Sequence, residues 1–300
     1  NGEKSWLMSP CFDFSTLSDP WISFLIFWEV ERTYDGMVLQ YSLDQGNTWD
    51  NVGAYGDPVT CLDQHWYNTN NIINLDQANP KHGWSGRQGA TNGGCQGGQG
   101  SGEWVTASHC MSNLAGEPSV RFRFLFGAGT TCNNFDGIAI DDVYIGAPPQ
   151  PDLETSYTCD GQTVSFSAVA PCATSIVWDL GDPGSGASNT GNGLAVTHDF
   201  ADPGNYTISV TLTPACGQNI TQTFEVTILG VEITTTDATC GQPNGSLQAV
   251  VTGSNGPFTY DWQPGNGAGA TFSGLAPGDY SLNVSGTDMC GATANATVQN

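Results

Sequence analysis

The chain has 300 residues, of which 29 are acidic and 6 are basic, so its formal net charge is −23. This balance excludes a nucleic-acid binder, which needs a basic footprint, and it disfavours docking on an anionic lipid surface. Charged residues make up only 12% of the chain, while Gly fills 39 positions and Pro 16, so the usual material of exposed helices is scarce and many short strands are expected.

The six cations are confined to the first part of the chain. Arg123 is the last of them, and 16 acidic side chains follow it. Such a surface stays soluble by self-repulsion and tolerates salt, which screens that repulsion. It also offers trypsin no site beyond Arg123.

The first region, residues 1–147, opens with strand patterns. Residues 21–28 (WISFLIFW) form an apolar run that is too short to span a membrane and is typical of a buried strand. No longer apolar run occurs in the chain, so direct membrane insertion is not expected. Residues 42–49 match the Asp-box pattern SxDxGxTW, in which Asp44 can accept backbone N–H groups while Trp49 packs beneath the turn. A single copy of this pattern predicts a structural hairpin turn.

A Gly-rich insertion, roughly residues 56–102, interrupts this region. It lacks the GK[ST] sequence and the following helix of a phosphate-binding loop. Its aromatic and basic side chains could stack on sugar rings, although such residues more often form a local core pinned by a disulfide. A Cys61–Cys95 bridge brackets the insertion and would contribute about 3–4 kcal/mol. The candidate sugar-binding residues are Trp66, Tyr67, Trp84 and Arg87.

Two breaks divide the rest of the chain. The proline-rich residues 146–151 disfavour both helix and central strand, and a second joint falls at residues 229–230, between two strand-like runs. Domain boundaries of 1–147, 151–229 and 230–300 follow, and all three have plausible domain sizes.

The second and third regions resemble each other. Each contains a Pro-Gly-x-Tyr motif whose tyrosine lies ten residues before a cysteine. The residues after the Pro-Gly turn alternate between apolar and polar, as in a strand with one buried face. Each also contains a tryptophan, expected to fill the middle of a small sandwich from a facing strand. The residues are Trp178, Tyr206 and Cys216 in the second region, and Trp262, Tyr280 and Cys290 in the third.

The second region resembles a PKD domain, an immunoglobulin-like sandwich. WDLGD at residues 178–182 is similar to the family's WDFGDG motif, and residues 198–206 are similar to its HxYxxPGxY stretch. Pro183 stands where the family has Gly, so the turn after residue 182 departs from the pattern. The third region resembles an SprB-type repeat of the giant gliding adhesins of Bacteroidetes. The matching pieces are residues 238–241, 244–247, 256–262, 273–280 and 288–290.

The first region is similar to the MAM-like or immune-inhibitor-A-like jelly rolls of secreted bacterial proteins. The pieces that carry this resemblance are residues 7–15, 34–42, 114–116 with 120–124, and 135–145. The resemblance implies that the opening and closing strands meet in one sheet, which would bring residues 10–15 near residues 139–145. The three resemblances together imply an all-β chain, a jelly-roll sandwich followed by two immunoglobulin-like sandwiches, from a Bacteroidetes surface protein exported by the type IX system.

Carboxylates of the first region are candidate calcium ligands, because a lectin-like jelly roll often encloses a structural Ca²⁺ that takes six to eight oxygen ligands. Strand alternation would point Asp142 inward, where a carboxylate needs a cation or several donors. Salt bridges to arginine or capping of backbone groups remain the alternative. The candidates are Glu29, Glu31, Asp35, Asp136, Asp141 and Asp142.

The ten cysteines show no zinc-ligand spacing and are typical of disulfides formed in an oxidising compartment. Parity in the third region predicts a Cys240–Cys290 bridge, and the repeat alignment then implies Cys159–Cys216. Cys172 is left over and competes for Cys216. The first region has an odd number of cysteines, so we expect either a bridge across the joint or a buried free thiol, with Cys11 the favoured residue.

The sequence contains no GxSxG, HExxH or paired catalytic Cys/His pattern, so an enzyme is not expected. The resemblances imply a non-catalytic segment of a large secreted adhesin at the bacterial cell surface. Its expected partners are surface glycans or neighbouring copies of the same protein, as a homo-oligomer or an extracellular filament. The alternative is a carbohydrate-targeting accessory module of a secreted hydrolase.

Overall fold

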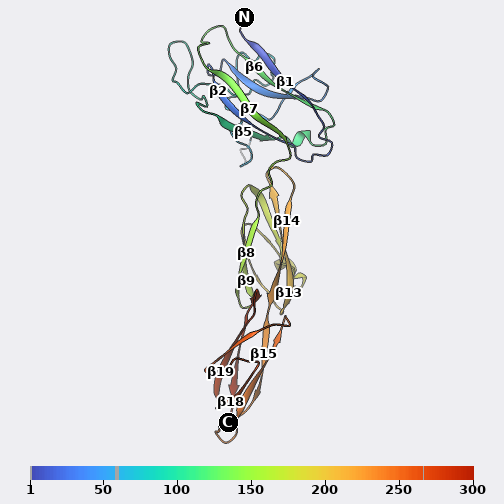
Figure 1. Cartoon of the computed structure of the whole chain (residues 1–300), viewed down its shortest axis with the longest axis vertical. Coiled ribbons are helices and arrows are strands. Elements are labelled where there is room, and N and C mark those ends of the chain that lie inside the picture. Colours follow the sequence, from blue (N-terminus) through green and yellow to red (C-terminus); the bar gives the residue numbers. More distant parts are fainter. Residues whose placement is uncertain (1, 58–60, 266) are drawn as a thin grey trace. The chain divides into compact units, whose positions relative to one another are not determined.

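The computed structural model describes residues 2–57, 61–265 and 267–300. The described chain is built almost entirely from β-strands (Figure 1), which confirms the predicted all-β class. Its two helical elements are short 3-10 turns, η1 (Ser112–Leu114) and η2 (Pro183–Asn189). Neither of these described helices is long or apolar enough to cross a membrane.

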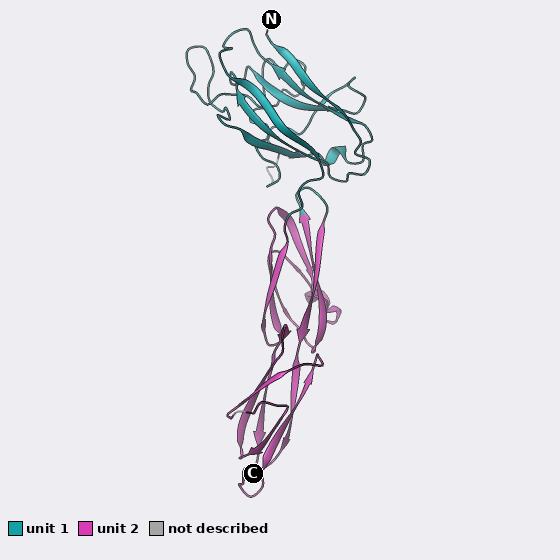
Figure 2. Cartoon of the chain, viewed as in Figure 1, with its two compact units in different colours: residues 1–151, 214–218 teal, residues 152–213, 219–300 magenta. Residues whose placement is uncertain are grey.

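The chain forms two compact units (Figure 2). Unit 1 comprises residues 1–151 and 214–218, and unit 2 comprises residues 152–213 and 219–300. The proline-rich break at residues 146–151 therefore lies where the main segment of unit 1 ends. The joint at residues 229–230 lies inside unit 2, between two separate hydrophobic cores. The turn at residues 214–218 belongs to unit 1, although its sequence position places it in the second predicted region.

Unit 1 is a sandwich of two antiparallel sheets, and consecutive strands mostly alternate between them. The first sheet has the order β1 (Lys4–Phe12), β6 (Val120–Gly127), β3 (Gly36–Ser42) and β4 (Asp50–Asn51). The second sheet has the order β5 (Val105–Cys110), β2 (Trp21–Glu29) and β7 (Gly137–Gly146).

The opening and closing strands of unit 1 do not pair. β1 pairs with β6 and β7 pairs with β2, so each is the outer strand of its own sheet. The expectation that residues 10–15 and 139–145 meet within one sheet is therefore wrong. Residues of both segments instead line one cleft, which lies between the two sheets.

The core of unit 1 lies between its two sheets. Alternate residues of β2, from Ile22 to Trp28, are buried, as expected for a strand with one face on the core. Trp84, from the Gly-rich insertion, is fully buried in the same core. The insertion therefore contributes to the main core of the unit.

Unit 2 contains two sandwiches, each made of two sheets. In the first sandwich, the larger sheet has the order β11 (Thr190–Asn192), β10 (Ala173–Asp179), β13 (Gly204–Pro214), β14 (Ile220–Ile228) and β20 (Met289–Cys290). The smaller sheet has the order β12 (Ala195–Asp199), β9 (Thr163–Val169) and β8 (Glu154–Asp160). In the second sandwich, one sheet has the order β15 (Gly230–Thr236), β16 (Gly245–Thr252) and β18 (Thr271–Leu275). The other has the order β17 (Thr259–Gln263), β19 (Gly278–Ser285) and β21 (Ala292–Val298).

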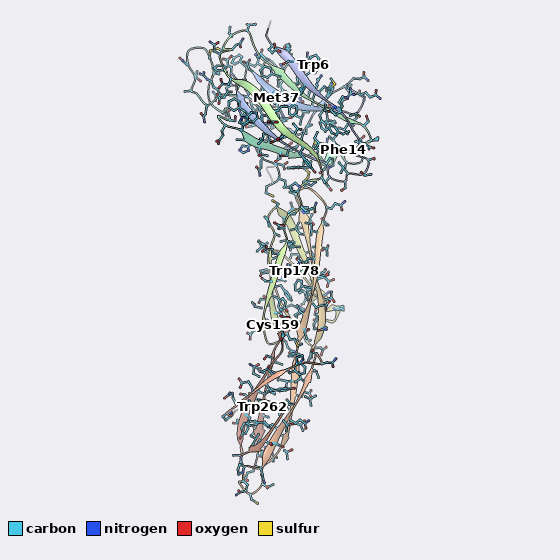
Figure 3. All side chains as sticks on the ribbon, in the orientation of Figure 1. Trp6, Phe14, Met37, Cys159, Trp178 and Trp262 are labelled. Atoms are coloured by element: carbon cyan, nitrogen blue, oxygen red, sulfur yellow. A yellow bond between two sulfur atoms is a disulfide. The ribbon has the colours of Figure 1, made fainter. Side chains whose placement is uncertain are left out.

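The two sandwiches of unit 2 repeat the same core interactions. Trp178 and Trp262 are fully buried (Figure 3), and their indole N–H groups donate to the carbonyls of Gly193 and Gly269, each at 2.9 Å. Each tryptophan lies on the strand next to the tyrosine-bearing strand in the same sheet, and not on a facing strand as expected.

The two tyrosines close equivalent corners. The Tyr206 hydroxyl donates to the Asp202 carbonyl at 2.7 Å, and the Tyr280 hydroxyl donates to the Ala276 carbonyl at 3.0 Å. In both cases the acceptor lies four residues upstream, the arrangement of a tyrosine corner in immunoglobulin-like sandwiches. The internal similarity of the sequence therefore reflects a shared fold.

The cysteine pairs differ from all three that the sequence suggested. The described bridges are Cys95–Cys132, Cys110–Cys216 and Cys159–Cys290, so the predicted Cys61–Cys95, Cys159–Cys216 and Cys240–Cys290 pairs are wrong. Cys61 and Cys172 are also disulfide-bonded. Cys11 and Cys240 are free and exposed, so Cys11 is free as expected but not buried.

The position of β20 explains the wrong pairing in unit 2. β20 belongs to the third region by sequence, yet it pairs in parallel with β14 and extends a sheet of the first sandwich. Cys290 is therefore buried in the core of the first sandwich, where it bonds Cys159. The Leu229 N–H donates to the Cys290 carbonyl at 3.0 Å, so the junction between the sandwiches has both main-chain and covalent links.

Removing the Cys159–Cys290 bridge is expected to destabilise unit 2 strongly. The two cysteines are 131 residues apart, and closing a loop of about 100 residues contributes about 4.7 kcal/mol in the chain-entropy account. We expect the double variant Cys159→Ser/Cys290→Ser of the full chain to lose about 3–5 kcal/mol in denaturant unfolding. The control Cys11→Ser/Cys240→Ser removes only free thiols, and a similar loss in that variant would contradict the prediction.

Candidate functional site

The aromatic residues of the insertion are core residues. Trp84 is fully buried and its indole N–H donates to the His65 carbonyl at 2.7 Å. Tyr67 is also buried, and its hydroxyl donates to the Leu39 carbonyl at 2.8 Å. Because neither ring is exposed for stacking, their assignment as sugar-binding residues is wrong, and local packing accounts for them.

The other two predicted sugar-binding residues also have internal partners. Trp66 is half-buried and packs edge-on against Trp84, with ring centroids 5.2 Å apart. Arg87 lies over the Phe135 ring at 4.7 Å and donates to the Ala90 carbonyl. These contacts hold the insertion together, and sugar binding by these two partly buried side chains stays a prediction.

Three of the six candidate calcium ligands anchor loops through backbone N–H groups. Both Glu29 carboxylate oxygens accept from the Gln88 N–H, at 2.8 and 3.0 Å, and the Glu31 carboxylate accepts from the Gln96 N–H at 3.1 Å. Asp35 Oδ1 accepts from the Gly129 N–H at 2.7 Å. This is the capping of backbone groups that the sequence analysis gave as an alternative to calcium binding.

Asp35 is the most buried of these carboxylates, with 3% of its surface exposed. Burial raises its pKa above the usual range, since desolvation outweighs the hydrogen bonds from Gly129 and Asn74, and the nearby Glu31 charge adds to the rise. A folded-state pKa above the unfolded value means that proton binding favours folding. Stability contributed by this group therefore falls as pH rises through its folded pKa.

The other three candidates lie apart, on or just before β7. Asp136, Asp141 and Asp142 are exposed. A β-bulge between the Ser23 and Leu25 positions of β2 breaks the alternation, and Asp142 has φ of +49° there. The expectation that Asp142 points inward is therefore wrong, because the bulge places two residues of β7 opposite one of β2.

Among the residues that the structure describes, the six carboxylates do not form one ligand cluster. The group whose ligand atoms do lie within 4.8 Å of one another is Glu31 with Cys95 and Cys132. These two sulfurs are joined in a disulfide, so they are not thiolate ligands in this state. Calcium binding by the carboxylates stays a prediction.

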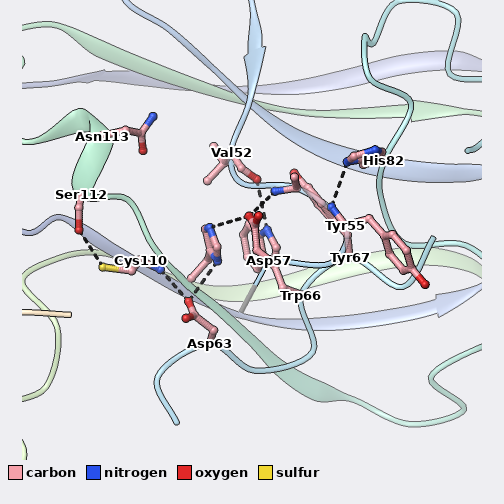
Figure 4. A network of polar contacts seen from close by, with 12 residues as sticks. Val52, Tyr55, Asp57, Asp63, Trp66, Tyr67, His82, Cys110, Ser112 and Asn113 are labelled. Carbon is pink, nitrogen blue, oxygen red and sulfur yellow. Dashed lines mark hydrogen bonds and ion pairs between the residues drawn. The ribbon is translucent and has the colours of Figure 1, made fainter. Parts of the chain in front are cut away.

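A buried histidine cluster was not found from the sequence. His109 Nδ1 lies 3.1 Å from Asp63 Oδ1 and Nε2 lies 3.8 Å from Asp57 Oδ2, and the imidazole stacks on Trp66 with centroids 4.6 Å apart. Figure 4 shows the Asp57, Asp63 and Trp66 side chains of this cluster. Gly53, at φ +64°, packs against the same ring and leaves no room for a side chain. No sequence motif marks this cluster, because its residues are far apart in the sequence.

The geometry of this cluster favours a structural role. Asp63 Oδ1 accepts a hydrogen bond from the Cys110 N–H at 2.9 Å, whereas the Nδ1 contact is close but lacks hydrogen-bond geometry. Both ring nitrogens of His109 face carboxylates. Neither is therefore placed to activate a hydroxyl or thiol nucleophile, as general-base catalysis requires.

The Asp-box turn is built as a compact network. Asp44 Oδ1 accepts from the Thr48 N–H at 2.9 Å and from the Ser42 hydroxyl at 2.7 Å, and Oδ2 accepts from the Thr48 hydroxyl at 2.7 Å. The Trp49 indole N–H donates to the Gly46 carbonyl at 3.0 Å, and Arg123 lies over the Trp49 ring. Hydrogen bonds from Thr48 and Ser42 lower the pKa of Asp44 to about 2.

An open apolar cleft of about 500 Å³ lies between β1 and β7 in unit 1. Its floor consists of core side chains, among them Ile22, Leu39 and Phe122. Its rim includes Leu7 and Val143, which are 62% and 47% exposed. No sequence pattern predicted this cleft, because it arises where the two sheets of the sandwich end on the same side.

Asp44→Asn is expected to lower the melting temperature at neutral pH. The difference in melting temperature from the parent should become smaller as the pH falls. The folded-state pKa of about 2 lies below the unfolded value of 3.8, so the carboxylate stabilises the fold above the unfolded pKa and loses that contribution as pH falls toward 2. Thermal unfolding of both proteins from pH 7 to pH 2 checks this. A difference that stays constant over the range would contradict it.

The calcium prediction is checked on the full chain. If Glu31 and Asp35 bind Ca²⁺, adding the ion at about 100 times its Kd to chelator-treated protein stabilises the fold by about 2.7 kcal/mol. Asp35→Asn should abolish this rise in melting temperature, while Asp141→Asn, at an exposed position, should leave it unchanged. No rise in the parent protein would refute calcium binding.

Two family models match segments of the chain that lie mostly in unit 2. A PKD domain model matches residues 146–228, and an SprB repeat model matches residues 233–267. The first match spans the first sandwich of unit 2, and the second covers about half of the second sandwich. No curated protein matches the chain.

Solved structures that resemble the chain are distant. A C-terminal 282-residue fragment of intimin, solved with the intimin-binding domain of its translocated receptor, is 15% identical, with 51% of this chain and 65% of that chain covered and a TM-score of 0.31. The chain thus spans less than two thirds of that fragment.

Fibronectin(III)-like modules of Clostridium thermocellum CbhA are 11% identical, with 49% of this chain and 94% of that chain covered and a TM-score of 0.23. An amphioxus IgVJ-C2 molecule is 14% identical over 48% of this chain and 99% of that chain, with a TM-score of 0.20. At these values the likenesses carry no argument about function. The family matches do, and a PKD-like sandwich followed by an SprB-type repeat fits a segment of a surface protein.

Proposed function

We propose that this chain is a non-catalytic segment of a large adhesin at the surface of a Bacteroidetes cell, exported by the type IX system. In this proposal unit 2 transmits tension and spaces unit 1 from the cell, while unit 1, a MAM-like jelly roll, makes contacts with ligands or with neighbouring copies. The PKD and SprB repeat matches support the surface location.

The observation that carries the proposal is the junction inside unit 2. β14 continues through Leu229 into β15 without a linker, β20 adds to the sheet of the first sandwich, and the Cys159–Cys290 disulfide bonds the two modules. A flexible connection would leave the modules free to separate under load. This junction instead resists separation through a covalent bond and main-chain hydrogen bonds.

The surface chemistry of unit 2 supports an extracellular role. It carries no Lys or Arg, so enzymes of trypsin specificity find no site in it. Disulfides such as Cys159–Cys290 are typical of oxidising compartments. The alternative of a sugar-targeting module for a hydrolase is weaker, because Tyr67 and Trp84, its predicted stacking residues, lie in the core.

Adhesion under flow tests the proposal. Beads coated with the full chain should be retained on bacterial cells or glycan-bearing surfaces better than beads coated with an unrelated β-sandwich protein. The variant Cys159→Ser/Cys290→Ser should attach equally well without flow but detach at lower shear, because its modules separate under tension. The control Cys11→Ser/Cys240→Ser should match the parent.

Two results would contradict the proposal. Retention no better than that of the unrelated protein would refute the adhesive function. Equal shear resistance of the disulfide variant would refute force transmission through the junction.

A further inference from the structure

One edge of unit 1 leaves core-facing side chains uncovered. Leu39, Phe124 and Leu7 are in register across β3, β6 and β1, so they share one face of the sheet. Their exposed fractions rise from 0% through 9% to 62% toward the edge. Leu7 thus occupies a core position that no described residue covers.

The facing sheet ends in the same way. Phe24 of β2 is 1% exposed, and the bulge places Asp142 and Val143 of β7 opposite it. Val143 lines the same cleft as Leu7 and is 47% exposed. The sandwich therefore lacks a covering element on this side, and the cleft reaches its core.

Both walls of the cleft are strand edges. β1 and β7 are the last strands of their sheets, so among the described residues one side of each carries main-chain N–H and C=O groups without a ladder partner. Pro10 has no N–H and a bulge lies between Met8 and Cys11, so the regular stretch of β1 is residues 4–8. Five residues are enough for a typical added strand.

We propose that this cleft binds an extended segment of a partner protein, which adds as a strand beside β1 and inserts aliphatic side chains at alternate positions. The strand edge selects an extended peptide, because a helix uses its own main-chain groups internally and has none to pair. The apolar floor selects aliphatic side chains, since a charge buried there would have no partner.

The outward positions of the added strand have a different chemistry. Arg121 belongs to β6, on the paired side of β1, and its Nη1 lies 3.9 Å from Met8 Sδ and donates to the Gln45 carbonyl at 3.4 Å, so it does not lie at the free edge. Side chains of the added strand that point outward therefore face water, where polar residues such as Thr fit. The expected partner segment alternates aliphatic and polar residues.

Binding of a synthetic strand tests the proposal on the full oxidised chain. The probe is a fluorescent, end-capped octapeptide of alternating Val and Thr, and its control has the same composition with four Val followed by four Thr. Only the alternating peptide can place every Val in the cleft, so we expect it to bind at least about tenfold more tightly by fluorescence anisotropy.

Variants on the two faces of β1 locate the binding. Leu7→Asp and Val143→Asp change exposed side chains of the cleft and should each weaken binding about tenfold or more, with the fold checked by melting temperature. Trp6→Asp is the matched control, because Trp6 is 52% exposed on the same strand but shares its face with Leu125. It should bind as the parent does.

Amide hydrogen exchange distinguishes strand addition from simple apolar docking. The alternating peptide should slow exchange in residues 4–8, because their free N–H groups become paired. The proposal is overturned by equal binding of the two peptides, or by binding without slowed exchange. It is also overturned if the chain alone dimerises and Leu7→Asp abolishes the dimer, since a second copy is then the occupant.

Discussion

Hydrogen bonding along sheet edges is the constraint on which the arrangement of this protein depends. Every sheet has two edges, and each exposes a row of main-chain groups that must be paired, covered or left to water. In unit 2 the β14 edge is partly filled by β20, which belongs to the next module. This one parallel pairing draws Cys290 into the first core and makes two sandwiches into a single unit. In unit 1 the outer strands β1 and β7 each contain a bulge, which shortens the stretch open to pairing.

The shortage of cations shapes the interior as well as the surface. A buried carboxylate is usually matched by Lys or Arg, but this chain has only six such residues. Glu31 and Asp35 instead accept hydrogen bonds from the backbone N–H groups of Gln96 and Gly129. Loops with free N–H groups thus replace basic side chains, which ties the Gly-rich insertion to the sandwich and explains why an acidic chain can bury acids.

Local patterns in the sequence predicted local structure well. The spacing of Trp178 and Tyr206, repeated at Trp262 and Tyr280, predicted two related sandwiches, and the equivalent hydrogen bonds of these residues bear this out. The apolar run at residues 21–28 also identified β2 as a strand, of which alternate residues are buried.

Contacts between distant segments could not be predicted in the same way. Parity and repeat alignment assume that bridges stay within a module, and the β20 strand breaks that assumption. Strand alternation failed at Asp142 because a bulge leaves no clear mark in the sequence. The aromatic residues of the insertion were ambiguous, because their composition is the same whether they face a sugar or the core. The open cleft depends on which strands end each sheet, and only the folded arrangement defines that.

The shared strand at the unit 2 junction also bears on how such proteins evolve. Modules joined by a simple linker can be duplicated, deleted or exchanged one at a time by recombination. A cut at residues 229–230 would instead leave Cys159 and Cys290 without each other and uncover the β14 edge. Selection should therefore pass these two sandwiches on as an inseparable pair. An engineer who wishes to transplant either one would need to move both, or to redesign the cysteine and the edge that its neighbour now protects.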